Sequence, residues 1–172
     1  MKRPQLVSKG TLARLLQEAE QARNLLDFSR SIESLERATR LDPANANLLL
    51  NLGHAYGKNF DFAAAERSFD RAIRIAPRKS EALAAAAMRA RDFGSATLAE
   101  RYYRAASEQK DVTPDTFVAL AENAERLSRL EEAAQLTERA LALKPNFPSA
   151  LLVRARLDRQ AGRLSEAEQI LR

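Results

Sequence analysis

Large and small apolar residues alternate along this chain at the spacings of an α-helix. Leu15 is followed four residues later by Ala19, and Phe28 precedes Ser31 and Leu35 by three and seven residues. Positions three, four and seven apart share one face of a helix, so each such run predicts an amphipathic helix. The small residues let two helices approach closely where they cross. We therefore expect pairs of packed helices.

The pattern returns every 34 residues. Pro43 and Pro77 are 34 residues apart, Pro145 follows Pro77 after 68, and Asp111 stands at the intermediate position. A proline ends a helix and disfavours helical backbone in the residue before it, so each proline closes one unit. Two columns of small residues keep the same register. They are Ser31, Ala65, Ala99, Ala133 and Ala167, and Ala38, Ala72, Ala106 and Ala140.

This small–large–small–proline pattern resembles the tetratricopeptide repeat, with Ala65, Phe69, Ala72 and Pro77 at the matching positions and Tyr56 in the preceding helix. The resemblance implies an all-α, right-handed solenoid of helical hairpins whose first helices line a concave groove. It implies four full repeats and one partial repeat. The boundaries are a basic tail at 1–10, repeats at 12–45, 46–79, 80–113 and 114–147, and a partial repeat at 148–172.

The last helix is expected to begin near Ser165, which leaves about eight residues before Arg172. An isolated helix needs roughly 12–15 residues. We therefore expect the fifth repeat to be truncated and the chain to be part of a longer polypeptide. An exposed end with Ile170 and Leu171 uncovered also makes self-association plausible.

The resemblance implies that inward positions of the first helices bind a protein segment. We expect an apolar floor, together with polar and charged residues that determine the alignment of the bound segment and which segments are selected. The floor is Leu16, Leu50, Met88, Val118 and Leu152, and the polar positions are Glu20, Asn51, His54, Lys58, Arg91, Glu122 and Arg156. This interpretation predicts that Leu50→Glu with Val118→Glu abolishes partner capture without lowering stability. The alternative is a stripe covered by the chain's own packing.

Some members of the family hold the carboxylates of chaperone peptides in a clamp of Lys, Asn and Arg. Here the corresponding places hold Leu16, Glu20, Asn51, Glu81 and Ala85, of which only Asn51 fits. Two acidic residues would repel a carboxylate, so this clamp is excluded.

The composition supports a non-enzymatic protein. In 172 residues there is no cysteine and one histidine, His54, which excludes disulfides, thiol catalysis and cysteine zinc sites. His54 has no partners at a spacing that suggests catalysis, and we expect no enzyme activity, metal or cofactor. No stretch approaches the roughly 18 apolar residues of a membrane span, and no signal peptide is evident. A cytoplasmic location is expected.

The net charge of +5 includes a row of arginines. Their spacings of four, three and four predict one stripe along a single helix, which could contact phosphates. The stripe is Arg67, Arg71, Arg74 and Arg78. Aromatic residues that could stack on bases are not interleaved with it, which disfavours nucleic acid. The alternative is a solvated face with ion pairs four residues apart. Those pairs are Glu33–Arg37, Glu36–Arg40, Asp70–Arg74 and Glu100–Arg104.

The interpretation that follows is a protein–protein interaction module. A rival is an array that precedes the catalytic domain of a larger bacterial protein, because the run from Leu151 to Leu164 resembles in style the repeats before sulfotransferase domains. No phosphosulfate-binding loop is present in this sequence. Four serines are expected to cap helix N-termini, namely Ser8, Ser80, Ser149 and Ser165.

Overall fold

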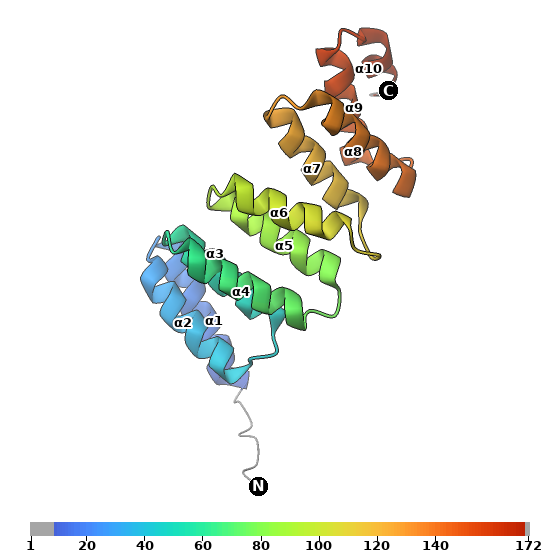
Figure 1. Cartoon of the computed structure of the whole chain (residues 1–172). Coiled ribbons are helices and arrows are strands. Elements are labelled where there is room, and N and C mark those ends of the chain that lie inside the picture. Colours follow the sequence, from blue (N-terminus) through green and yellow to red (C-terminus); the bar gives the residue numbers. More distant parts are fainter. Residues whose placement is uncertain (1–8, 171–172) are drawn as a thin grey trace. The chain divides into compact units, whose positions relative to one another are not determined.

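The computed structural model describes residues 9–170, and within them the regular structure consists of ten α-helices and no strands (Figure 1). Short turns join the helices in hairpins, as the alternating pattern predicts. The helices are α1 (Lys9–Asn24), α2 (Phe28–Leu41), α3 (Ala46–Lys58), α4 (Phe62–Ile75), α5 (Lys79–Asp92), α6 (Ala96–Ser107), α7 (Pro114–Arg126), α8 (Leu130–Leu143), α9 (Pro148–Gln160) and α10 (Leu164–Ile170).

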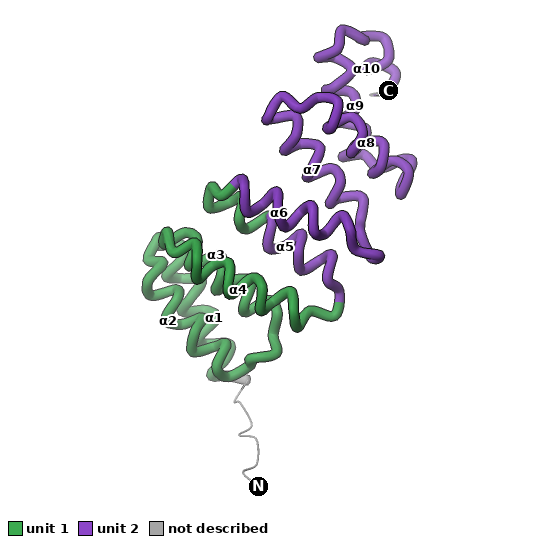
Figure 2. Tube along the Cα trace, viewed as in Figure 1, with its two compact units in different colours: residues 1–77, 88–95 green, residues 78–87, 96–172 purple. Residues whose placement is uncertain are grey.

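The chain divides into two compact units, and the division falls within α5 (Figure 2). Unit 1 is residues 1–77 and 88–95, and unit 2 is residues 78–87 and 96–172. In unit 1, α1 packs on α2, α2 on α3, and α3 on α4. In unit 2, α7 packs on α6, α8 and α9, and α9 also packs on α8 and α10.

Three helices of unit 1 begin at side-chain caps. Asp27, Asn45 and Asp61 each accept a hydrogen bond from the backbone N–H three residues further on. Such caps satisfy one of the free N–H groups at a helix start. The prediction of serine caps was wrong where it can be checked, because the serines lie inside helices whose first residue precedes them. These serines are Ser80, Ser149 and Ser165, and Ser8 lies outside the described residues.

The turn inside each hairpin contains one residue with positive φ, and these residues are 34 apart. They are Leu26, Phe60, Gly94, Ser128 and Gly162, with φ between 58° and 92°. Glycine adopts this conformation without steric cost, whereas Leu26 and Phe60 do so under strain. The repeated turn shows that the 34-residue register of the sequence is also the register of the backbone.

The small columns form the places where paired helices touch. Residues of the first column are at most 6% exposed, and the alanines at 38, 72, 106 and 140 are fully buried. In the first pair, the Ser31 hydroxyl on α2 donates a hydrogen bond to the carbonyl oxygen of Ala19 on α1 over 3.0 Å. Close approach through small residues is thus confirmed.

Tyr56 links α3 to α2, because its hydroxyl donates a hydrogen bond to the Glu36 carboxylate. Burial and this acidic neighbour raise the pKa of Tyr56 to about 12. The tyrosine therefore stays protonated and able to donate at physiological pH.

Unit 2 contains an ionic network around the Glu100 carboxylate of α6. Arg129 contacts it at 3.0 Å and Arg104 at 2.7 Å, and both arginines also reach Glu132 of α8. The Arg129 guanidinium is the main cause that lowers the pKa of Glu100, followed among the charged neighbours by Arg104. The predicted Glu100–Arg104 pair is therefore confirmed as part of a larger network.

Two other pairs named for the alternative of a solvated face are not formed. Within residues 9–170, no ion pair joins Glu33 to Arg37 or Glu36 to Arg40. Glu36 instead accepts the Tyr56 hydroxyl.

The arginine stripe is also shorter than predicted. Helix α4 ends at Ile75, so Arg78 lies beyond it and pairs with Glu81 at 2.7 Å. The Ala76 cap and the proline that follows it set this helix end.

The predicted all-α helical-repeat fold is confirmed. The number and boundaries of the repeats stay predictions. Most of the basic tail at 1–10, and Leu171, lie outside the described residues.

Candidate functional site

A hollow of about 270 Å³ opens on unit 1 between α1, α2 and α3. Apolar and polar side chains from successive turns of these helices line it. The apolar members are Leu16, Ala19, Phe28, Leu35 and Ala55, and the polar members are Glu20, Arg23, Ser31, Asn51 and His54. We call this feature the unit 1 hollow. It contains four of the predicted groove residues: Leu16, Glu20, Asn51 and His54.

His54 lies at the edge of this hollow and is held from α5. Its Nε2 atom is 2.6 Å from Oδ2 of Asp92. Lys58 Nζ contacts the same oxygen at 3.0 Å and donates to the Asp92 backbone carbonyl at 2.8 Å. Hydrogen bonds from Lys58 and His54 lower the pKa of the Asp92 carboxyl, so it is ionised at neutral pH.

Burial lowers the pKa of His54 below 6.5, although Asp92 acts in the opposite direction. The imidazole is therefore neutral at physiological pH, and because the ionised Asp92 carboxylate can only accept, the Nε2–H group donates to it and Nδ1 is the acceptor. A neutral histidine with an Nδ1 acceptor is a suitable polar group at the edge of a binding surface. Over residues 9–170, Asp92 is the one side chain that shares a hydrogen bond with the His54 ring.

The titration of His54 is directly measurable because it is the chain's one histidine. We expect its imidazole NMR signal to titrate below pH 6.5, and Asp92→Asn to lower the midpoint further because Asp92 raises the pKa. Lys58→Gln should raise it. Since the folded state binds fewer protons than the unfolded state, this group's contribution to stability is present above pH 6.5 and decreases as the pH falls below that value. A midpoint above 6.5 in the folded protein would contradict this environment.

Asn51 and Arg89 form a second link at the hollow. An Arg89 guanidinium nitrogen donates to Asn51 Oδ1 over 3.0 Å. Burial lowers the pKa of Arg89. Arg89 was not among the predicted site residues, because nothing in a repeat register shows which residues of the next helix reach back.

Leu50 and Val118 do not form an exposed floor, and that prediction was wrong. Leu50 is 3% exposed and Val118 is 7% exposed. Helix α3 packs on both α2 and α4, and α7 packs on three helices of unit 2, so little of either helix is left open. Glutamate at these positions would destabilise the fold, so the double substitution cannot test partner capture alone.

Met88 and Leu152 are exposed, at 56% and 51%. Lys58 is partly buried against Asp92, and Arg91 lies exposed on α5. In unit 2, Arg156 lies 3.6 Å from Glu122, so these two predicted residues meet each other.

A second hollow, of about 430 Å³, lies between α9 and α10 in unit 2. It includes the predicted residues Leu152 and Arg156, together with Leu164 and Ala167. Arg156 is held by Glu125 at 3.0 Å, which raises the pKa of its guanidinium. Beside this hollow, Asp158 lies 3.9 Å from Arg154 and is closer to Arg163, at 2.6 Å.

Over residues 9–170, no helix has both the length and the apolar character needed to cross a membrane. The same residues contain no group of three or more His, Asp or Glu side chains placed to hold a metal ion.

Helical hairpins in a 34-residue register define a helical-repeat protein. Residues 27–59 match the family model described as TPR repeat, and residues 46–79 match the one described as tetratricopeptide repeat. Residues 27–79 therefore contain tetratricopeptide repeats. Repeats of this family are typically non-catalytic scaffolds. No curated protein matches the sequence.

Solved structures share the fold at low sequence identity. MamA is 19% identical, with 95% of this chain and 90% of that chain covered and a TM-score of 0.61. PilF from Pseudomonas aeruginosa is 18% identical, with 94% and 73% covered and a TM-score of 0.65. Yeast Tom70 is 22% identical, with 91% and 34% covered and a TM-score of 0.70.

Proposed function

We propose that this chain is a protein-interaction scaffold that binds a peptide or helix of a partner protein, with the unit 1 hollow as its main contact. The observation that supports this most is the hollow lined by both apolar and polar side chains, which contains four of the predicted groove residues. An apolar side chain of the partner would fill the space beside Leu16. Glu20, Asn51 and His54 would select the residues on either side of it.

The chemistry of the edge supports selectivity. Glu20 is exposed and pairs with Arg23 at 3.2 Å, while Asn51 is exposed and keeps its amide nitrogen for a partner after Oδ1 accepts from Arg89. Amide and carboxylate groups of this kind suit a peptide backbone and a basic side chain. A free carboxylate would be repelled by Glu20.

Six further contact residues remain proposals, and the burial of Val118 limits its contact with a partner. They are Met88, Arg91, Val118, Glu122, Leu152 and Arg156. A cytoplasmic location and self-association are likewise proposals. The rival proposal, an array that precedes a sulfotransferase-type domain, is not favoured by any observation on the described residues.

Blocking the hollow should weaken peptide binding without unfolding the chain. The change is Glu20→Arg with Asn51→Arg, at two exposed positions where long cationic side chains would occupy the space and reverse its charge. We expect affinity for a peptide selected on the wild-type chain from a displayed random library to fall at least about 10-fold, which is the loss of one good contact. Isothermal titration calorimetry measures it.

The matched control is Gln17→Arg with Gln21→Arg, which adds two arginines to exposed positions of α1 that do not line the hollow. It should bind within about twofold of wild type, a difference of a few tenths of a kcal/mol. Equal binding by the blocked variant, or a library that yields no binder, would refute the proposal.

A further inference from the structure

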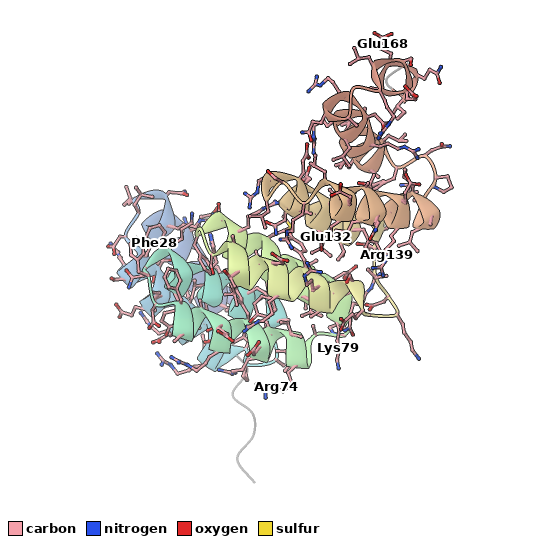
Figure 3. The ribbon with its side chains drawn as sticks, turned by 45° about the horizontal axis from the view of Figure 1, so that its top comes forward. Phe28, Arg74, Lys79, Glu132, Arg139 and Glu168 are labelled. Carbon is pink, nitrogen blue, oxygen red and sulfur yellow. The ribbon has the colours of Figure 1, made fainter. Side chains whose placement is uncertain are left out.

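The outward surfaces of α2 and α4 in unit 1 are strongly basic. Figure 1 shows these two helices running alongside each other, with α1 and α3 behind them. Their exposed charged side chains are six arginines and two carboxylates: Arg30, Arg37, Arg40, Arg67, Arg71 and Arg74, against Glu33 and Asp70. Arg74 extends away from α4 in Figure 3.

Five of these arginines lack an acidic partner within residues 9–170. We call them the arginine face: Arg37, Arg40, Arg67, Arg71 and Arg74. Within residues 9–170, the acidic residues four positions before Arg37 and Arg40 form no ion pair with them. An unpaired guanidinium keeps five N–H donors directed to solvent.

The repeat itself does not require these arginines. Arg37 and Arg71 occupy the same register position, and so do Arg40 and Arg74. In unit 2, the position of Arg37 and Arg71 is occupied by Ala105 and Arg139. The position of Arg40 and Arg74 is occupied by Glu108 and Ala142. Alanine and glutamate are as compatible with these helices as arginine is. Folding alone therefore leaves the basic character of α2 and α4 unexplained.

We propose that the arginine face binds an acidic segment of a partner protein, rich in Asp and Glu, separately from the unit 1 hollow. Guanidinium groups pair bidentately with carboxylates. Arg67 and Arg74 are seven residues apart, which is about 10 Å along a helix. Carboxylates on one side of an extended peptide recur every ~6.7 Å, so a short acidic segment covers the distance from Arg67 to Arg74.

An acidic peptide fits this surface better than a nucleic acid does. Glu33 and Asp70 lie among the arginines and would repel a continuous phosphate backbone, whereas a protein segment can place a neutral or basic residue opposite them. The aromatic residue between Arg67 and Arg74 is Phe69, which is fully buried and cannot stack on a base.

The test uses the full chain and a fluorescein-labelled decaglutamate peptide, with a 20-base-pair DNA duplex as the competing probe, both followed by fluorescence anisotropy. The variant is Arg37→Gln with Arg71→Gln and Arg74→Gln. The control has the same loss of three charges on other exposed residues: Arg14→Gln with Lys110→Gln and Lys144→Gln. Circular dichroism checks that both variants are folded.

We expect decaglutamate affinity to fall about 10-fold or more in the variant and to stay within about twofold in the control, since long-range charge alone would weaken both equally. Equal losses in the two, or no binding to the wild type, would overturn the proposal. Tighter binding of the duplex, lost in the same variant, would also overturn it and assign the face to nucleic acid. The Glu20 and Asn51 variant should still bind decaglutamate, which separates this proposal from the peptide site.

Discussion

Phe69→Ala should lower the free energy of unfolding by about 3–5 kcal/mol, the range for removing a fully buried aromatic side chain. Phe69 of α4 is 0% exposed, and its ring stacks on that of Phe93 with centroids 6.3 Å apart. Alanine would leave a cavity that the paired helices cannot close by collapsing. Urea unfolding followed by far-UV circular dichroism measures the loss.

Phe60→Ala is the matched control, because Phe60 is 81% exposed. This substitution should lower the free energy of unfolding by less than about 0.5 kcal/mol, as other surface substitutions do. Similar losses for the two phenylalanines would contradict the packing described for unit 1.

Gly53→Ala should cost about 1–3 kcal/mol even though alanine is the better helix former. A Cβ atom at Gly53 would lie 2.5 Å from Cε1 of Phe69 and 3.0 Å from the backbone oxygen of Ala65. The ring is held in the core and the second atom belongs to the backbone, so neither yields easily. Thermal unfolding of the single variant measures this cost.

The cause can be isolated by combining the two changes. In a Phe69→Ala background the ring contact is gone and only the approach to the Ala65 oxygen remains, so Gly53→Ala should cost less than in the wild type, which gives a coupling of about 1 kcal/mol or more in a double-mutant cycle. Additive losses would show that the glycine is needed for another reason.

The repeat register made most of the fold predictable. Small residues such as Ala65 and Ala72 recur at fixed positions, and their burial follows from helical periodicity alone. The turns were harder to predict from the sequence. Glycine is the residue type that indicates positive φ, and it is present at Gly94 and its later equivalent, whereas Leu26 and Phe60 adopt positive φ without being glycine.

Part of the lining of the unit 1 hollow could be predicted from the sequence. Glu20, Asn51 and His54 could be placed at the hollow because the first helix of a repeat has one inward face. Leu50 could not be judged exposed or buried from its own helix, since the answer depends on how many other helices pack on α3. The contacts made by Arg89 and Asp92 depend on the packing of α5, which a local pattern does not contain.

The central claim, that a partner peptide occupies the unit 1 hollow, is tested most directly by the imidazole signal of His54. This residue lines the hollow and is the chain's one histidine, so its resonances need no assignment by mutation. A library-selected peptide should shift those resonances in proportion to the bound fraction, and the shift should be absent in the variant with Glu20→Arg and Asn51→Arg. If the peptide binds while the His54 resonances stay unchanged, the partner binds elsewhere and the account of this hollow is wrong.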